Sequence, residues 1–299
     1  MLTIKKIFSK NYYRRKYYAV LKKIAPKHLI WVLTKERYKS ITGKTLRYRR
    51  PVDINEKLAW LTRYWQHPLK TKCADKYAVR QYITEQGLGH LLIPLLGVYS
   101  SSREICFDVL PDKFVLKCNH GSGYNVICQD KSTLDIDATK KQIDEWMQTD
   151  FSRIAYEIHY KDIPRKIVCE QMISETAPVE YQFWCINGEP ESILVCRKNF
   201  DHTYDAWSYS LKWEHLCDRL GEEKNTGVER PTTLENMIEY ARILSKSFPF
   251  VRVDFYEVRG RVYFAELTFT PSANILSAYK DSFHSRLGKK LVLPEKYIQ

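Results

Sequence analysis

Apolar and polar residues alternate along the chain with two different periods. Apolar residues recur every three or four positions in four stretches, and this spacing predicts amphipathic helices over 53–65, 75–87, 137–148 and 232–244. A period of two predicts strands over 94–99, 113–119, 124–128, 166–173, 181–187, 191–197, 250–257 and 262–269. Because helices and strands are mixed and several strands adjoin as hairpins, the pattern favours an α+β fold with antiparallel sheets over a doubly wound parallel sheet.

The stretch DKFVLKCNHGSGYNVICQD, residues 112–130, places a lysine in a predicted strand and a glycine-rich loop directly after it. Lys117 would project from the face opposite its apolar neighbours. The loop HGSG at 120–123 lets backbone N–H groups approach an anion, and the ammonium adds the charge that a phosphate needs. The stretch therefore suggests a nucleotide phosphate site. The alternative is an edge-strand lysine that discourages aggregation, followed by an ordinary hairpin turn.

The stretch FVRVDFYEVRGRVYFAELTFTPSAN, residues 250–274, predicts a hairpin whose register follows from its pattern. A three-residue loop at 259–261 places Asp254 opposite Glu266 and Arg252 opposite Thr268, with the apolar residues on the other face. A two-residue loop at 259–260 would mix the two faces, so we predict the first. Two neighbouring carboxylates need a counter-charge, either Mg²⁺ or Arg252. The alternative is a hydrated sheet face with an arginine–carboxylate pair.

Between these two stretches lies IVCEQMISETAPVEYQFWCINGEP, residues 167–190, a strand, a polar connection and a second strand. A connector between two lobes is a natural place for backbone groups to bind adenine and for a carboxylate to bind ribose hydroxyls. The alternative is a plain strand–loop–strand unit.

The net charge of +13 is concentrated at the N-terminus. Residues 1–50 hold 16 Lys or Arg and one acid, a balance of +15, whereas the other 249 residues hold 32 basic and 34 acidic side chains, a balance of −2. Aromatic and aliphatic residues interleave with these cations, a composition that suits anionic headgroups or another polyanion. Single-stranded nucleic acid is a less favoured partner, and a solvated helical cap packed on the body is the structural alternative.

Other features of the composition exclude several classes of protein. No apolar run approaches the roughly 20 residues that cross a bilayer. The N-terminus lacks the apolar region and cleavage site of a secretory signal, so we expect a cytoplasmic protein, with peripheral attachment at the inner face of the membrane through residues 1–50 as a further hypothesis. The eight cysteines form no C-x-x-C pair, and neither disulfides nor a zinc site is expected.

Seven stretches taken in order resemble a known family: INEKLAWL, ADKYAVRQYI, FVLKCNHGSG, CEQMI, EYQFWCINGEP, FVRVDFYE and AELTFTPS. Together, from about 51 to 285, they resemble the ATP-grasp ligases, and within them the teichuronopeptide-biosynthesis-like (TupA-like) proteins of surface polysaccharide gene sets. The resemblance implies an ATP-grasp fold in which two α+β subdomains hold ATP between them. The implied division is a basic amphipathic segment at 1–50, a helical or α/β region at 51–110, the small subdomain at 111–170 and the large subdomain at 171–299.

The same resemblance implies a role for each site residue. Lys117 would hold the α or β phosphate with help from Lys76, the loop at 121–123 would cover the phosphates, and a hinge at 170–173 would bind adenine. Arg197 would steady the transferred phosphoryl group, and Arg252 is also counted as catalytic. The cofactor-binding residues are Lys76, Lys117, His120, Gly121, Ser122, Gly123, Glu170, Gln171, Met172, Ile173 and, near the ribose, Glu175 or Glu180; the Mg²⁺ ligands are Asp254, Glu266 and Thr268.

Two positions depart from the family pattern. Many ATP-grasp enzymes have Glu-x-Asn at the metal site, whereas this chain has Glu266-Leu267-Thr268, so the third ligand would be the Thr268 hydroxyl or water. The following TPSAN lacks a glycine common in that turn, which leaves the acceptor side open.

The implied chemistry is ligation of a carboxylate to an amine with ATP and Mg²⁺, through an acyl phosphate. By family analogy the acid is a uronic acid of a surface glycan or its precursor, and the amine is an amino acid. The amine also needs a base, for which His120 is the first suspect. A sugar or protein kinase is one alternative, although its glycines would precede the lysine and no H-R-D or G-x-x-x-x-G-K-[ST] occurs. A nonenzymatic polyanion-binding protein is another.

Overall fold

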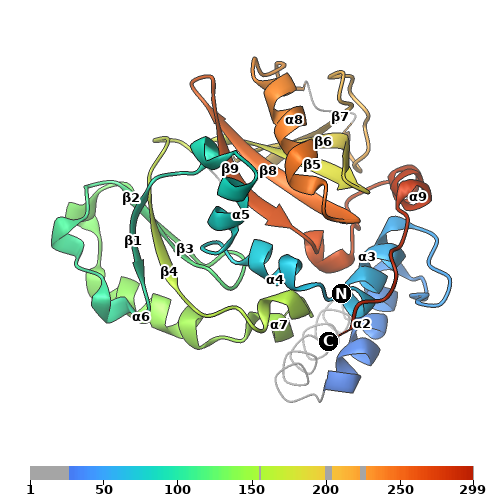
Figure 1. Ribbon diagram of the computed structural model, residues 1–299, viewed down its shortest axis with the longest axis horizontal. Helices are drawn as coiled ribbons and strands as arrows, with labels where there is room; N and C mark the ends of the chain where they lie inside the picture. The colour runs from blue at the N-terminus through green and yellow to red at the C-terminus, as the bar shows by residue number, and fades with distance from the viewer. Residues whose placement is uncertain (1–26, 155, 199–203, 223–226, 299) are drawn as a thin grey trace, which may run out of the picture.

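The computed structural model describes residues 27–154, 156–198, 204–222 and 227–298, which form two antiparallel sheets with helices around them (Figure 1). The helices are α2 (Lys27–Thr42), α3 (Ile54–Tyr64), α4 (Pro68–Ala74), α5 (Val79–Glu85), α6 (Ile136–Gln148), α7 (Phe151–Ile154), α8 (Leu234–Ser245) and α9 (Asp281–Lys290). The strands are β1 (Leu95–Tyr99), β2 (Phe114–Cys118), β3 (Asn125–Cys128), β4 (Ile167–Gln171), β5 (Val179–Ile186), β6 (Glu189–Lys198), β7 (Tyr204–Tyr209), β8 (Phe250–Val258) and β9 (Arg261–Thr268).

The predicted helices and strands are all present with shifted ends, and the α+β class is confirmed. The described part of the chain adds α4, α7, α9 and β7, which were not predicted. Helix α4 has seven residues, and it begins at Pro68 because His67 accepts a hydrogen bond from the Leu69 N–H at 3.2 Å. Helix α9 is mostly polar and has Gly288 near its end, which weakens its pattern.

The small sheet has the strand order β1-β4-β2-β3, with every pair antiparallel. Phe114, Leu116 and Cys169 point into its core, where Ile143 of α6 packs against them. Strand β1 pairs with β4 along its length. Strand β1, which lies in the predicted region 51–110, is thus part of the same sheet as β2, β3 and β4.

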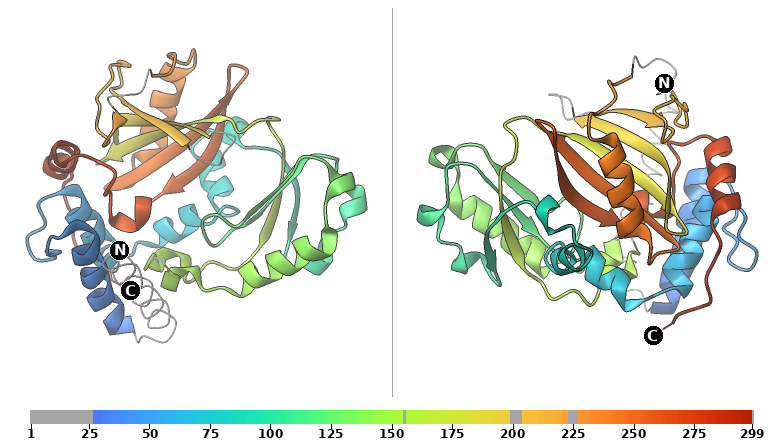
Figure 2. Two further views of the ribbon diagram at one scale, coloured as in Figure 1. Left: turned by 180° about the vertical axis from the view of Figure 1, so that it is seen from behind. Right: turned by 45° about the horizontal axis from the view of Figure 1, so that its top comes forward.

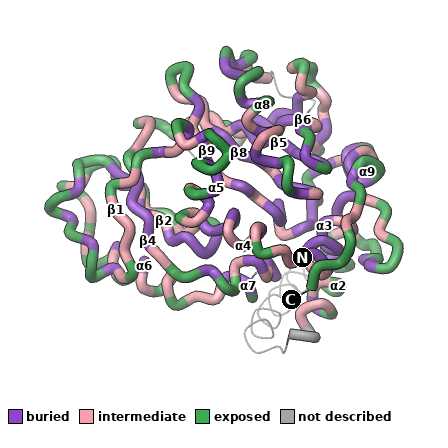
Figure 3. The backbone as a smooth tube through the Cα atoms, viewed as in Figure 1, coloured by how far each residue is buried: buried purple, intermediate pink, exposed green. Residues whose placement is uncertain are grey.

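The large sheet has the order β7-β6-β5-β8-β9, again antiparallel. Helix α8 covers one face (Figure 2), and there its Met237 and Leu244 belong to a core that includes Phe183 and Val253. Buried backbone is concentrated along β5, β6 and β8, whereas the connecting loops are exposed (Figure 3). Because side chains alternate along a strand, the other face of this sheet carries the polar residues.

The hairpin of β8 and β9 has the predicted pairing at the two carboxylates, but its turn differs from the predicted one. Asp254 lies opposite Glu266, as predicted. The turn, however, is the two-residue loop Arg259–Gly260, both with positive φ, and the predicted three-residue loop was wrong. A bulge at Ala265 restores the register. The bulge arises because the buried apolar residues Val262, Phe264, Leu267 and Phe269 share one face only if one residue is skipped between Phe264 and Leu267.

Residues 27–50 pack on the body of the protein. Leu33 of α2 contacts Tyr156, and Tyr38 and Tyr48 form a cluster with Ala59 and other buried residues. Residues 27–50 of the predicted basic segment at 1–50 therefore contact the body, and residues 1–26 lie outside the described residues. Among the described helices, none combines the length and apolar character needed to cross a membrane.

Candidate active site

A cavity of about 510 Å³ opens between the two sheets, and the segment 172–178 that joins β4 to β5 forms one of its walls. Its volume is within the usual range of small-molecule sites, about 300–1,000 Å³. Seven residues predicted for the nucleotide line it: Lys117, Glu170, Gln171, Met172, Ile173, Glu175 and Glu180. Ile93 and Val115 add apolar surface on the side of the small sheet. This end suits a flat, apolar ring such as a nucleobase.

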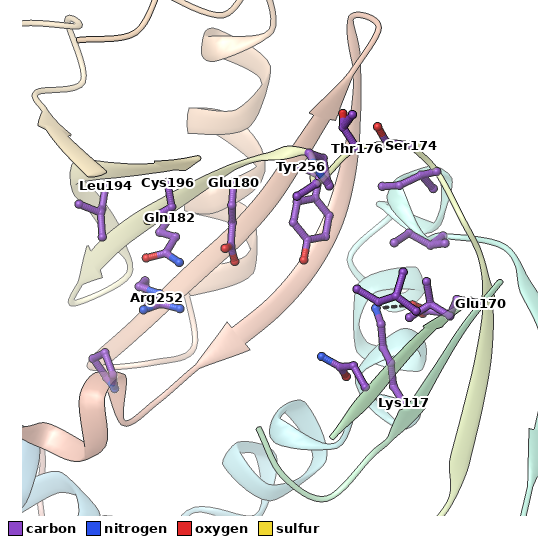
Figure 4. A pocket seen from close by; sticks show the side chains of 18 of the residues that line it. Lys117, Glu170, Ser174, Thr176, Glu180, Gln182, Leu194, Cys196, Arg252 and Tyr256 are labelled. Carbon is purple, nitrogen blue, oxygen red and sulfur yellow. Dashed lines mark hydrogen bonds and ion pairs between the residues drawn. The ribbon is translucent and has the colours of Figure 1, made fainter. Parts of the chain in front are cut away.

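Strand β2 and the start of the connector place charged groups at the middle of the cavity. The Lys117 ammonium lies 2.6 Å from a Glu170 carboxylate oxygen, and the Arg80 guanidinium lies 3.2 Å from the other oxygen. Figure 4 shows Lys117 and Glu170 facing Glu180 and Arg252 of the large sheet across the cavity.

A smaller chamber of about 130 Å³ shares Lys117, Glu170 and Glu180 with the main cavity and adds Lys76 and Glu266. Lys76 and Lys117 thus line the same chamber as Glu266, one of the residues predicted to bind Mg²⁺. Burial lowers the pKa of Lys76 below its usual value, and the nearby Glu266 carboxylate opposes this shift. The chamber matches the charge of a metal-bound phosphate chain.

The glycine loop adjoins this end of the site through Lys76. The Lys76 ammonium donates to the Gly121 carbonyl oxygen at 2.5 Å, which ties the loop to the segment before α5. A Cβ atom at Gly121 would meet Phe151 at 2.9 Å, so only glycine fits there. Ser122 and Gly123 are exposed, and Gly123 has a φ of +78°. His120 is buried in the small subdomain, with Nε2 3.1 Å from the Trp146 carbonyl oxygen, and it does not line the cavity.

The residues predicted to bind Mg²⁺ form one network on the polar face of the large sheet. The Thr268 hydroxyl lies 2.7 Å from a Glu266 oxygen and 3.3 Å from an Asp254 oxygen. Arg252 approaches Asp254 at 2.5–3.1 Å and Glu266 at 3.6 Å. Within the described ranges no group of three or more His, Cys, Asp or Glu side chains is arranged to hold a metal alone. Two carboxylates and a hydroxyl fit Mg²⁺, which takes its remaining ligands from phosphates and water.

Burial places an electrostatic cost on this network. Asp254 is fully buried, and burial raises the pKa of its carboxyl to about 8 although Arg252 opposes the shift. The Glu266 side chain is 39% exposed to the cavity. Although burial works against its charge, Lys76 and Arg252 bring the pKa of Glu266 below its usual value. A bound divalent cation would favour the ionised form of both acids.

Arg197 is not brought to the cavity. Its strand neighbour Cys196 lines the cavity, so the Arg197 side chain points to the opposite face of β6. There it lies over the Trp207 ring, 5.1 Å from the ring centre, and 3.4 Å from Asp205. Glu175, in contrast, lines the cavity but is largely exposed and pairs with Lys113 at 2.6 Å.

The far end of the cavity is built by residues that sequence analysis did not identify. Gln182 and Trp184 line it, and Gln182 Oε1 is buried without a hydrogen-bond partner among the described residues. Both alternate with Glu180 along β5, so the period of two could have revealed them. Arg219, which lies 5.2 Å from the centre of the Tyr279 ring, belongs to no predicted element and carried no such signal.

The chain matches known proteins at the level of the family. Residues 56–292 match the family described as TupA-like ATPgrasp. No curated protein matches the chain.

Solved structures with a similar fold are remote in sequence. They include a D-alanine–D-alanine ligase from Bacillus anthracis complexed with ATP (16% identity, TM-score 0.46, covering 86% of this chain and 72% of that one). They also include an L-amino acid ligase from Bacillus licheniformis (15% identity, TM-score 0.49, covering 75% and 51%). The ATP-grasp ligase PsnB complexed with minimal precursor, Mg and ADP is a third (10% identity, TM-score 0.41, covering 79% and 64%).

The family match extends over most of the chain, including both sheets and every residue of the candidate site. It confirms the predicted fold and ATP as the predicted nucleotide. The chain belongs to the TupA-like ATP-grasp family.

Proposed function

We propose that this protein is an ADP-forming carboxylate–amine ligase, which joins the carboxylate of a uronic acid, in a surface glycan or its precursor, to an amino acid or another amine. One observation carries the proposal: Lys76, Lys117 and Glu266 surround one chamber that adjoins the cavity lined by the connector. The connector would face the nucleobase, the two lysines would face the phosphates, and Glu266 would bind the metal. These groups follow one another in the order of the parts of a Mg²⁺-bound nucleotide. The choice of a uronic acid as the substrate rests on the likeness to teichuronopeptide-biosynthesis proteins.

In this proposal the small sheet and the connector bind the nucleotide. Residues 171–178 bind adenine, and Glu180 accepts hydrogen bonds from ribose hydroxyls. Lys117 leaves part of its contact with Glu170 to bind the α or β phosphate, and Lys76 assists it. The exposed tip of the glycine loop, Ser122 and Gly123, covers the phosphates with its N–H groups.

The large sheet supplies the charges for phosphoryl transfer. Asp254, Glu266 and Thr268 would hold Mg²⁺, which neutralises charge on the phosphates when bound. The carboxylate of the acid attacks the γ phosphorus, ADP leaves, and the amine then attacks the acyl carbon and displaces phosphate. Arg252 stabilises the negative charge that gathers on the transferred group, since it borders both the metal site and the cavity.

Arg219 is our candidate for binding the acid substrate. It lines the far end of the cavity together with Trp184 and Tyr279, beyond the Mg²⁺ residues as seen from the connector. A guanidinium beside aromatic rings suits a sugar that carries a carboxylate.

Residues 1–26 would attach the enzyme to an anionic surface. Each cation near such a surface contributes on the order of 1 kcal/mol, and a lipid-linked glycan precursor would lie there. Because residues 27–50 pack on the body, the test is deletion of residues 1–26 alone. We expect weaker binding to phosphatidylserine vesicles, and unchanged binding would refute the attachment.

The proposed reaction is tested by a matrix of uronic acids and amines. Glucuronic acid, galacturonic acid and UDP-glucuronic acid are each combined with glycine, alanine, glutamate or lysine, and ADP and the mass of the product are measured. We expect one acid to give ADP and an amide only when an amine is present. ADP formation with a phosphorylated sugar and no amine requirement would identify a kinase instead. A protein that binds no ATP would point to the nonenzymatic alternative.

A further inference from the structure

The face of β5 that borders the main cavity carries one polar side chain to which the nucleotide assigns no role. Glu180, Gln182 and Trp184 alternate along β5, and all three line the cavity, so their side chains form a row on this face. At about 3.3 Å per residue, Gln182 lies about 7 Å from Glu180 along the strand. Figure 4 shows Gln182 beside Glu180 on the wall that the large sheet forms.

Gln182 lines the cavity and is buried, but its carboxamide has no partner. The residue is 7% exposed. No hydrogen bond joins its carboxamide to any residue that the structure describes, and Oε1 is covered from solvent. Because the oxygen is covered, the N–H₂ group is the polar end of the side chain that can meet a ligand in the cavity.

The neighbouring strands do not supply the missing hydrogen bonds. Opposite Gln182 lie Leu194 of β6, which is apolar, and Asp254 of β8, which accepts hydrogen bonds from Arg252. A buried carboxamide without partners costs free energy that an apolar side chain of the same length would not. Gln182 is therefore a group whose hydrogen bonds a ligand would complete.

The two cavities indicate which part of the bound molecules lies beside Gln182. Glu180 lines both the main cavity and the smaller chamber assigned to the phosphates, whereas Gln182 lines only the main cavity of these two. Arg219 and Trp184 likewise line the main cavity and not the chamber. Gln182 thus belongs to the end of the site that we assign to the acid substrate.

A strained turn borders the same end of the cavity. The three consecutive residues Ser272, Ala273 and Asn274 have φ of 49°, 50° and 64°. Non-glycine residues in this left-handed region are unfavourable and gather at functional sites. Ser272 is exposed and lines the main cavity, so the turn adds a second neutral polar group to this end.

The groups at this end match a hydroxylated ring that carries an acid. Arg219 and Arg252 supply charge for a carboxylate or a phosphoryl group, whereas the neutral N–H₂ group of Gln182 suits a neutral oxygen. Trp184 and Tyr279, whose ring centres lie 5.4 Å apart, add apolar surface for the face of a sugar ring. An apolar wall with a few placed polar groups is the usual build of a specific small-molecule site.

We propose that Gln182 determines the specificity for the acid substrate by donating a hydrogen bond from Nε2 to a ring hydroxyl of a hexuronic acid. The inference rests on the proposed function, in which a uronic acid occupies this end of the cavity. A site that pairs a buried polar group with a substrate hydroxyl rejects an analogue without that hydroxyl, because the group then stays unpaired. Gln182 thus selects hydroxylated acids over acids of the same shape that lack hydroxyls.

Tetrahydropyran-2-carboxylic acid tests this contact, because it has the ring and the carboxylate of a hexuronic acid but no hydroxyl. The measured quantities are kcat/KM for the uronic acid that the wild type accepts and the inhibition constant of the analogue against it. Both are determined for the wild type, Gln182→Met and the control Gln129→Met. Gln129 is an exposed carboxamide that lines the same cavity on the side of the small sheet. The melting temperature and the Kd for Mg²⁺ and ATP are measured for each protein.

We expect Gln182→Met to lower kcat/KM for the uronic acid by about 10- to 100-fold, and to change the inhibition constant of the analogue by less than about threefold. Its melting temperature should equal or exceed that of the wild type, because an apolar side chain replaces an unpaired polar one. The Kd for ATP should be unchanged. Gln129→Met should leave every one of these quantities as in the wild type.

Three results would overturn the role of Gln182. These are an unchanged kcat/KM for the uronic acid, an equal loss of affinity for the analogue, and a Kd for ATP that weakens as much as kcat/KM falls. The last result would place Gln182 at the nucleotide. A wild type that forms an amide with no uronic acid would instead contradict the proposed function, and the inference with it.

Discussion

The Lys117 ammonium and the Glu170 carboxylate lie 2.6 Å apart, although sequence analysis assigned one to the phosphates and the other to the adenine hinge. Arg80 holds the second oxygen of the same carboxylate. Glu170 thus neutralises two cations at the junction of the phosphate and nucleobase ends of the cavity. A phosphate that binds Lys117 leaves Glu170 paired with Arg80, so neither buried charge is left alone.

This arrangement predicts that ATP binding depends on Lys117. Lys117→Met should weaken ATP binding by about 10- to 100-fold, because a hydrogen bond to a charged group contributes about 1.5–3 kcal/mol. Lys113→Met is the matched control, since Lys113 lies just before the same strand but pairs with Glu175 in solvent. Calorimetric titration with Mg²⁺ and ATP measures both. Equal affinity of the two variants would remove Lys117 from the phosphate site.

Asp254 should be required for stabilisation by Mg²⁺ and ADP. Asp254→Asn keeps the shape of the side chain but removes a ligand charge, and it also leaves Arg252 buried without its partner, at a cost of about 3–5 kcal/mol. The informative quantity is therefore the shift in melting temperature on adding Mg²⁺ and ADP to each variant. We expect a clear shift for the wild type and for the exposed control Asp281→Asn, and none for Asp254→Asn. A full shift in Asp254→Asn would contradict the assignment.

The two arginines of the large subdomain give opposite predictions. Arg197→Ala should change kcat and KM for ATP by less than about twofold, because its side chain lies over Trp207 on the face away from the cavity. Arg219→Ala should lower kcat/KM for the acid substrate by about tenfold or more, the loss of one charged hydrogen bond. Steady-state kinetics decides, and a large effect at position 197 would restore the original assignment.

The sequence predicted the strand pattern and the opposition of Asp254 and Glu266, because both follow from which residues must be buried. It did not predict the bulge at Ala265 or the turn at 259–260. The shorter turn shifts the pairing by one residue and the bulge shifts it back, so Asp254 lies opposite Glu266 in both arrangements. Arg197 was predicted at the phosphoryl group but lies on the other face of β6, because a predicted strand does not show on which face of the sheet a residue near its end lies. Arg219 was missed because it belongs to no predicted element, and only the tertiary fold brings it to the cavity.

Glu157, a buried carboxyl that accepts a hydrogen bond from the Thr270 hydroxyl, should make stability depend on pH. Its pKa of about 7 in the folded protein exceeds the usual 4.5, so between these values the folded state holds a proton that the unfolded state has released. Stability should fall as pH rises through this window, by on the order of 3 kcal/mol in total. Denaturant unfolding at pH 5 and pH 8 should show this loss in the wild type and a smaller loss in Glu157→Gln. Parallel pH dependence of the two proteins would mean that Glu157 ionises normally.

The central claim is that a substrate carboxylate attacks the γ phosphate of ATP in the cavity between the two sheets. The direct measurement uses the accepted acid with ¹⁸O in both carboxylate oxygens and follows the label by mass spectrometry of the released phosphate. The account predicts one ¹⁸O atom in each phosphate, because the attacking oxygen leaves the acid when the amine displaces the phosphate. Phosphate without ¹⁸O, formed together with the amide, would contradict an acyl phosphate and the account built on it.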